Sequence, residues 1–151
     1  MEKDKVLPYL QNICAKREYC SSEILKKAET ALEGDREAAQ EMLASLKADR
    51  FVDDARYAAA FARERSSLTG WGPDKIRYTL LMKGISKSDI AEALEQVDPE
   101  TAGAKMEKLI RAKRKTLQGD PSIKFKLIKY ALSRGYRYDD VAPAVGRILS
   151  E

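Results

Sequence analysis

The sequence predicts an all-α protein built from short helices. Apolar side chains recur three and four residues apart along almost the whole chain, as they do on one face of a helix. Gly, Pro, Ser and Asp residues interrupt this pattern about every 12–18 residues, with the start and stop signals typical of helices. No stretch keeps the alternation of apolar and polar residues that marks a half-buried strand.

The first third of the chain predicts three helices. The first covers residues 3–17. Ser21 or Ser22 caps the second helix, because a hydroxyl there can accept a hydrogen bond from a free N–H of the first turn, and this helix ends at Gly34. Asp35 opens the third helix by the same capping chemistry.

The middle third predicts three more helices. Asp53 caps the fourth. Pro73 opens the fifth, since proline is favoured at the first helical position, and Gly84 ends it. Ser86 and Asp89 resemble a capping box at the start of the sixth helix, with Asp in place of the usual Glu.

The last third predicts the seventh, eighth and ninth helices. Asp98 and Asp120 open the seventh and eighth, which end near Gly119 and before Gly135. The ninth begins late, within 138–140, because the proline that follows is tolerated only in the first turn of a helix.

An internal repeat groups these helices into three sets of three. When the middle and last sets are aligned at Gly84 and Gly135, five aliphatic positions coincide, namely Ile76 with Leu127, Leu81 with Leu132, Ile90 with Val141, Leu94 with Val145, and Val97 with Ile148. The first set fits less well. We therefore expect three tandem helix-turn-helix-like repeats, over residues 1–49, 50–97 and 98–151, in an elongated and curved chain.

The composition excludes several classes of enzyme. The chain has no His, so Ser-His and Cys-His catalytic pairs and His-containing zinc sites are excluded. Cys14 and Cys20 match no metal or redox motif, and a reduced pair is favoured over a secreted disulfide. No glycine-rich phosphate loop is present, and Asp53 with Asp54 fits a helix start better than an acid–base pair. We expect no catalytic activity, no cofactor and no metal.

No targeting or membrane segment is expected either. The first residues lack the apolar core of a signal peptide, and no apolar run approaches the ~20 residues of a membrane span. These features predict a cytoplasmic protein.

The charge is concentrated in the C-terminal third. The net charge of +4 divides into −2 over residues 1–49, +1 over 50–97 and +5 over 98–151. Residues 105–137 contain 11 basic and two acidic residues, a net charge of +9. Such asymmetry favours a polyanionic partner over a merely solvated surface.

The seventh and eighth helices carry most of these cations. On a helical wheel, apolar residues of the seventh form one arc opposite the basic ones, and Lys113 falls inside the apolar arc, where it must extend to water or bind something. For the eighth we expect a buried face of Ile123, Phe125, Leu127, Ile128 and Leu132. Tyr130, Tyr136 and Tyr138 among the cations are typical of a phosphate-binding surface with stacking aromatics, although each tyrosine taken singly fits the half-buried edge of a core better. The candidate contacts of this third are Lys105, Lys108, Arg111, Arg114, Lys115, Lys126, Lys129, Arg134 and Arg137.

The middle third resembles the central signature of the RecX family. The matching segments are Arg-Phe-Val-Asp-Asp-Ala-Arg-Tyr-Ala at 50–58, Gly-Trp-Gly-Pro-Asp-Lys-Ile-Arg at 70–77 and Leu-Leu-Met-Lys-Gly-Ile at 80–85. Upstream, Ser-Ser-Glu-Ile-Leu at 21–25 is similar to the first repeat of that family. The resemblance is strong over the middle third, fair before it and weak over the last third.

This resemblance implies a three-repeat helical regulator without catalytic activity. RecX proteins bind RecA filaments formed on single-stranded DNA, lie in the filament groove and suppress ATP hydrolysis, strand exchange and co-protease activity, and several also bind DNA. The implied roles are recombination, DNA repair and the SOS response, and a monomer that contacts DNA directly or through RecA is expected. We interpret the signature residues of the middle third as structural; they are Asp53, Trp71, Gly72, Ile76 and Gly84. Three cations of the same third are further candidate contacts, namely Arg63, Lys75 and Lys83.

Two other functions remain open at this point. A helix-turn-helix regulator of duplex DNA would need base-reading side chains on an exposed helix, but the fifth to ninth helices contain only Gln96 and Gln118, both at helix ends. A helical adaptor with a protein partner alone is the third hypothesis, and a steep salt dependence of binding would count against it.

Overall fold

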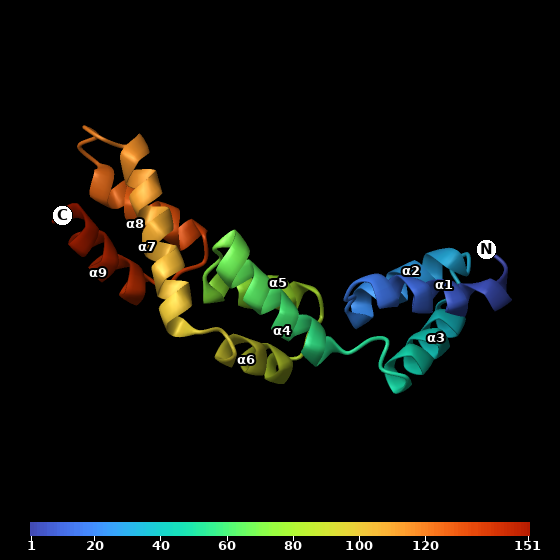
Figure 1. The fold of residues 1–151 in the computed structure, drawn as a ribbon. Coiled ribbons are helices and arrows are strands. Elements are labelled where there is room, and N and C mark those ends of the chain that lie inside the picture. The colour runs from blue at the N-terminus through green and yellow to red at the C-terminus, as the bar shows by residue number, and fades with distance from the viewer. The chain divides into compact units, whose positions relative to one another are not determined.

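The computed structural model describes all 151 residues and contains only helices, which confirms the all-α prediction (Figure 1). Nine are α-helices, and a short π-helical turn, η1, follows the fourth. Their bounds are α1 Lys3–Lys16, α2 Ser21–Ala31, α3 Arg36–Ala48, α4 Asp54–Glu64, η1 Arg65–Thr69, α5 Pro73–Met82, α6 Lys87–Glu95, α7 Pro99–Thr116, α8 Ile123–Ser133 and α9 Tyr138–Leu149.

The chain forms two compact units. The N-terminal unit comprises Met1–Ala58 and Leu80–Ile90, and the C-terminal unit comprises Ala59–Thr79 and Ala91–Glu151. Helices α4, α5 and α6 each contribute residues to both units. Each unit has its own apolar core.

Helices α1, α2 and α3 enclose the core of the N-terminal unit (Figure 1). Its centre consists of fully or almost fully buried aliphatic side chains, Val6, Leu10, Ile24, Ala28, Ala39, Leu46 and Val52. Asp35 caps α3 as predicted, by accepting a 3.1 Å hydrogen bond from the backbone N–H of Ala38.

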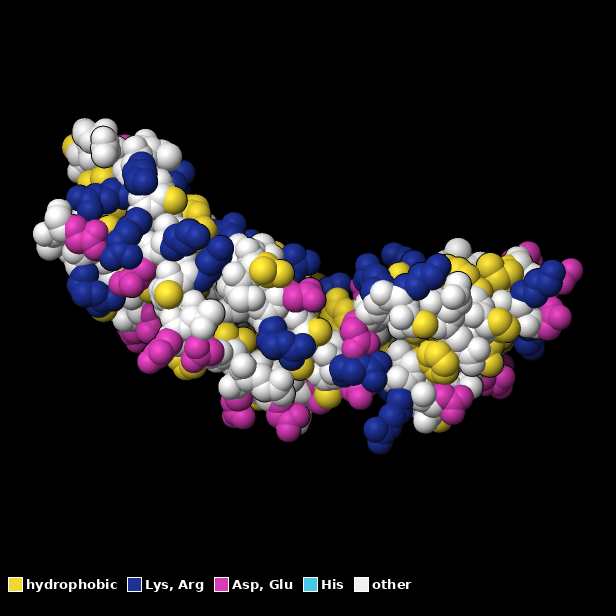
Figure 2. All heavy atoms as spheres, viewed as in Figure 1, with side chains coloured by type: hydrophobic (Ala, Val, Ile, Leu, Met, Phe, Trp, Pro, Cys, Tyr) yellow, Lys and Arg dark blue, Asp and Glu magenta, His cyan; other side chains and the backbone are white.

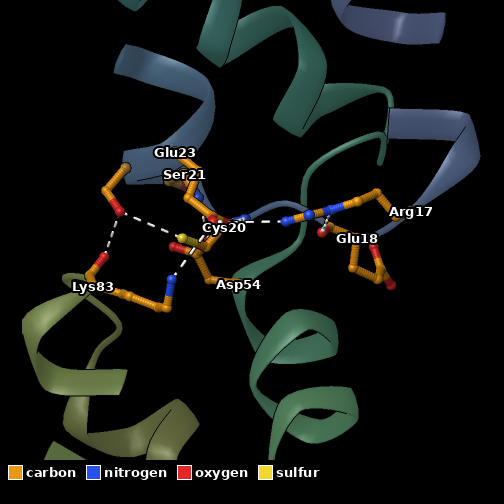
Figure 3. Close-up of polar contacts among 8 residues, drawn as sticks. Arg17, Glu18, Cys20, Ser21, Glu23, Asp54 and Lys83 are labelled. Atoms are coloured by element: carbon orange, nitrogen blue, oxygen red, sulfur yellow. Dashed lines mark hydrogen bonds and ion pairs between the residues drawn. The ribbon is translucent and has the colours of Figure 1, made fainter. Parts of the chain in front are cut away.

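The N-terminus of α2 is held by Cys20 rather than by the predicted serines. Cys20 is the N-cap residue and forms a capping box with Glu23, whose Oε1 accepts a 3.0 Å hydrogen bond from the backbone N–H of Cys20. Ser21 and Ser22 are the first two helical residues. They bind other elements: the N–H of Ser21 donates to Asp54 Oδ1 at 2.7 Å (Figure 3), and Ser22 Oγ donates to the carbonyl of Lys83 at 2.6 Å.

Glu23 is also the charged centre of this cluster. Lys83 Nζ lies 3.5 Å and Arg17 Nη2 lies 3.7 Å from its carboxylate (Figure 3). Burial alone raises the pKa of Glu23, but hydrogen bonds from Cys20 and the ammonium of Lys83 outweigh it, so that the pKa lies below its ordinary value of 4.5. The ionised form is therefore the one that the fold stabilises.

Helices α7, α8 and α9 enclose the core of the C-terminal unit (Figure 1). Its buried members are Met106, Ile110, Leu127, Ala131, Tyr136, Val141, Ala144, Val145 and Ile148. Helix α9 begins at Tyr138, the earliest position that we predicted, and Pro143 therefore lies beyond its first turn.

Two residues that we expected in this core are exposed instead. Phe125 retains 66% of its accessible surface and Leu132 retains 41%. Only Leu127 and Ala131 of α8 are buried. At 100° per residue, Phe125 lies ~200° around the helix from Leu127 and therefore faces away from the core.

A contact between two glycines connects α5 with the end of α8. The N–H of Gly72 donates to the carbonyl of Arg134 at 2.7 Å, and the N–H of Asp74 donates to the carbonyl of Gly135 at 3.0 Å. A Cβ on Gly72 would lie 2.3 Å from the carbonyl carbon of Gly135, and a Cβ on Gly135 would lie 2.3 Å from Cβ of Lys75. Neither position leaves room for a side chain.

Trp71, which precedes this contact, is half-buried at the edge of the unit rather than enclosed in the core. Its ring meets that of Phe61 edge-on, with centroids 6.1 Å apart. The guanidinium of Arg65 and the ammonium of Lys75 lie over the ring, 4.9 and 4.5 Å from its centroid. Trp71 thus packs against one ring and two cations.

We predict that Gly72→Ala destabilises the protein by about 1–3 kcal/mol or more, because the added methyl group forces the two backbones apart. Gly103→Ala is the matched control, since a Cβ on Gly103 meets nothing within 4 Å, and alanine in a helix should be neutral or stabilising. Urea unfolding followed by circular dichroism measures both. Equal stability of the two variants would contradict the prediction.

We predict that Glu23→Gln reduces the loss of stability in acid. Because the pKa of Glu23 is lower in the folded than in the unfolded state, its carboxylate stabilises the fold above pH ~4.5, and this contribution disappears as the pH falls through the folded-state pKa. Urea unfolding between about pH 6 and about pH 3 should therefore show a shallower pH dependence for the variant than for the wild type. Glu41→Gln, on an exposed position of α3, should follow the wild-type curve.

We predict that Trp71→Ala lowers stability by about 2–3 kcal/mol, less than the ~3–5 kcal/mol typical of an enclosed Trp. The loss comes from the contacts with Phe61, Arg65 and Lys75. Thermal unfolding measures it. An unchanged melting temperature together with lost binding to a partner would instead identify Trp71 as a contact residue.

Candidate nucleic-acid interface

The outer face of α7 carries exposed cations. Lys108 and Lys115 are exposed and have no ion pair or hydrogen bond. Arg111 is also exposed, but its guanidinium binds Glu151 at the C-terminal end of the chain, with Nη2 2.6 Å from Oε1. Figure 2 shows Lys and Arg side chains along the visible face of α7, with few acidic ones between them. Two of the three outer cations are thus free for a partner.

Other cations of α7 serve the fold. Arg114 donates a hydrogen bond to the carbonyl of Ile148 in α9. Lys113, which the helical wheel places among apolar residues, extends over the ring of Tyr130, with Nζ 5.4 Å from the centroid. Lys105 is half-buried, beside the turn at Gly70. None of these three presents a fully exposed charge.

Helix α8 has one engaged lysine and two free ones. Lys126 Nζ lies 2.5 Å from Asp120 Oδ2, and this hydrogen bond, with a second from the N–H of Ser122, lowers the pKa of Asp120. Lys129 is exposed and unpaired. Lys124, which we did not single out in the sequence, is equally exposed and unpaired.

The two arginines that follow α8 are engaged at the glycine contact. Arg134 donates to the carbonyls of Thr69 and Gly70, and so closes the end of η1. Arg137 Nε lies 3.4 Å from Asp74 Oδ1, an oxygen that also accepts from Arg77 at 2.9 Å. Arg134 therefore holds the end of α8 to η1, and Arg137 holds the start of α9 to α5.

Of the cations predicted in the middle third, Arg63 alone has a free side chain. It is exposed, and only its backbone carbonyl is engaged, by Ser67 Oγ. Lys83 binds Glu23, and Lys75 lies over Trp71. Of the signature residues in this third, Asp53 accepts from the N–H of Arg56 at 3.1 Å, Ile76 is buried, and Gly84 has a φ of +79°.

The aromatic residues of the last third differ in their access to a ligand. Tyr136 is buried, and burial raises the pKa of Tyr136 to about 12. Tyr130 is half-buried beneath Lys113. Tyr138 and Phe125 are exposed, at 59% and 66%. Phe125 is thus a candidate that we missed in the sequence by assigning it to the core.

The thiols and carboxylates are the other groups of the chain that could react or bind a metal. Burial raises the pKa of both thiols, Cys14 and Cys20, which are therefore protonated at neutral pH. No group of three or more Cys, Asp and Glu side chains could hold a metal ion. No helix combines the length and apolar character needed to cross a bilayer.

The sequence matches known proteins over its middle third and beyond. Residues 53–94 match the family model of the second three-helix domain of RecX. The regulatory protein RecX of Clostridium botulinum strain Alaska E43 is 36% identical over 115 residues, which cover 74% of this chain and 53% of the relative. The regulatory protein RecX of Clostridium tetani is 30% identical over 119 residues, which cover 76% of this chain and 54% of the relative. The chain thus spans about half the length of these curated relatives.

Two crystal structures share the fold. One, of a regulatory protein RecX, superimposes with a TM-score of 0.81 at 25% identity and covers 99% of this chain and 72% of that one. The other, of RecX from Lactobacillus salivarius, has a TM-score of 0.82 at 19% identity and covers 99% of this chain and 97% of that one. Matches of the sequence to the signature domain and to several regulatory proteins agree with this common fold. The chain belongs to the RecX family.

Proposed function

We propose that this chain is a non-enzymatic cytoplasmic regulator that binds RecA filaments on single-stranded DNA and inhibits RecA. The inhibited activities would be ATP hydrolysis, strand exchange and co-protease function, with consequences for recombination, DNA repair and the SOS response. One observation carries the proposal beyond family membership: α7 and α8 hold exposed lysines, Lys108, Lys115, Lys124 and Lys129, without internal partners. Such charges favour a polyanion or an acidic protein surface.

The proposed interface is smaller than the set of cations in the sequence. Six of the candidates, Arg111, Arg114, Lys126, Arg134, Arg137 and Lys83, bind groups of the protein itself. A cation that already has a partner gains less from a phosphate, because the existing contact must be broken first. We therefore assign binding to the four free lysines and to Arg63.

We further propose that residues 1–49, 50–97 and 98–151 are three repeats of one unit. Support comes from positions that coincide when Gly84 and Gly135 are aligned. Leu81 and Leu132 are 40% and 41% exposed, and the paired Ile90 and Val141 are both buried. These two pairs have matching environments, whereas Leu94 and Val97 are only half-buried and their counterparts Val145 and Ile148 are fully buried.

The decisive assay is the ATP hydrolysis of RecA on single-stranded DNA with this protein titrated in. We expect inhibition that saturates as the filament becomes occupied. Unchanged hydrolysis at a concentration where the protein demonstrably binds the filament would refute the proposed inhibition.

We predict that the double substitution Lys108→Glu and Lys129→Glu weakens binding to single-stranded DNA and to the RecA filament at low salt. Each lost phosphate contact should flatten the log–log dependence of affinity on salt by about 0.7. Folding should survive, because exposed substitutions usually change stability by no more than about ±0.5 kcal/mol. Fluorescence anisotropy of a labelled oligonucleotide across salt concentrations measures the slope.

The matched control reverses two exposed lysines of α2, Lys26→Glu and Lys27→Glu. This pair should lose much less affinity, because the first third of the chain has no excess of positive charge. Equal losses from both pairs would mean that the total charge of the protein, and not a located surface, drives binding. If the Lys108→Glu and Lys129→Glu variant instead lost affinity for duplex DNA of one particular sequence, a helix-turn-helix reader of duplex DNA would be favoured.

A further inference from the structure

We propose that Phe125 is a stacking platform for an unpaired base of single-stranded DNA, with Lys124 and Lys129 binding the adjacent phosphates. The inference rests on the proposed function and specifies how the chain would contact single-stranded DNA. It concerns a residue that has no part in the core of the protein.

The position of Phe125 on α8 favours contact with a ligand. Its side chain is 66% exposed and lies on the side of the helix opposite the buried Leu127 and Ala131. Lys129 follows four residues later, and residues at this spacing are neighbours on a helix surface. Phe125 thus presents an accessible ring beside a positive charge.

The surrounding charges distinguish Phe125 from an ordinary exposed apolar residue. Isolated exposed apolar side chains are common and need no explanation. Here Lys124 and Lys126 flank the ring in the sequence, and Lys129 lies one turn further along. Asp120 neutralises Lys126, whereas Lys124 and Lys129 have no partner. An exposed aromatic ring with an unpaired lysine one turn away, and a second unpaired lysine next to it in the sequence, suits single strands, where bases stack and phosphates pair with Lys.

Four other aromatic residues of the C-terminal unit are less suited to this role. Two cations already lie over Trp71, and Lys113 lies over Tyr130. Tyr136 is buried. Tyr138 is exposed, but the neighbouring Arg137 is bound to Asp74. Phe125 therefore combines exposure with free cations better than any of them.

Stacking on Phe125 requires a base that is not already stacked in a duplex. We expect this surface to prefer single-stranded to double-stranded DNA and to depend on the base itself, not only on the phosphates. An abasic oligonucleotide keeps the phosphates and lacks the bases, so it separates the two contributions.

The test compares oligothymidylate with an abasic strand of equal length, on the full chain, by fluorescence anisotropy. The wild type should bind oligothymidylate more tightly. Phe125→Ala should weaken that binding by about 5- to 150-fold, to the level of the abasic strand, with an unchanged salt slope. Phe125→Tyr should keep most of the preference, since it retains an aromatic ring, and circular dichroism should show that both variants remain folded.

Tyr78→Ala is the matched control, because Tyr78 on α5 is 65% exposed and has no free cation beside it. Lys75, three residues earlier, lies over Trp71, and the adjacent Arg77 binds Asp74. This variant should bind as the wild type does. Equal affinity of the wild type for the two strands, or an unaltered preference in Phe125→Ala, would overturn the proposal. So would a Phe125→Ala variant that binds oligothymidylate normally and loses only the RecA filament, because the ring would then dock on protein.

The proposed function and this inference can fail separately. If the wild type shows the base preference and Phe125→Ala loses it, stacking is supported even where RecA hydrolyses ATP undisturbed. If RecA is inhibited but the base preference is absent, the regulation stands and the stacking role is refuted.

Discussion

The contact between Gly72 and Gly135 is the constraint on which the C-terminal unit depends. At the start of α5, the N–H groups of Gly72 and Asp74 have no partner inside their own helix, and the carbonyls at the end of α8 accept them. The positive end of one helix dipole thus meets the negative end of another. This arrangement exists only because both residues lack a side chain, since either Cβ would lie 2.3 Å from the opposing chain.

In the N-terminal unit the start of α2 likewise meets the end of another helix, but here side chains make the contact. There Ser22 donates to the carbonyl of Lys83 at the end of α5, and Glu23 binds the ammonium of the same lysine. Asp74 has the corresponding role in the C-terminal unit, with Arg137 as its cation. Cations near these helix ends are thereby engaged, whereas four lysines on the outer faces of α7 and α8 are free.

Most of the fold could be predicted from the sequence because its helices begin and end with local signals. Asp35, Asp53 and Asp98 each accept a first-turn N–H, as their side chains and positions require. Phe125 could also have been placed correctly, since its angle on the helical wheel puts it opposite Leu127.

Long-range contacts were beyond such reasoning. The ion pair between Arg111 and Glu151 joins residues 40 positions apart, and no local pattern distinguishes Arg111 from its free neighbour Lys108. Gly72 shows a related limit: no positive φ requires glycine there, and the need for it arises from a backbone that lies 63 residues later in the sequence. Sequence reasoning therefore found the basic surface but could not separate the engaged cations from the free ones.

The assignment of Leu80–Ile90 to the N-terminal unit has a consequence for the order of events on the ribosome. When Ala58 has just left the exit tunnel, Lys83, the partner of Ser22 and Glu23, is still inside it. At about 5–20 residues per second, bringing the segment to Ile90 out of the tunnel takes roughly another 2–6 s. During that interval α1, α2 and α3 can already bury their shared apolar faces, while Ser22 Oγ and the Glu23 carboxylate still lack their contacts with Lys83. The N-terminal unit therefore folds in two stages, and the second begins only when the end of α5 leaves the exit tunnel.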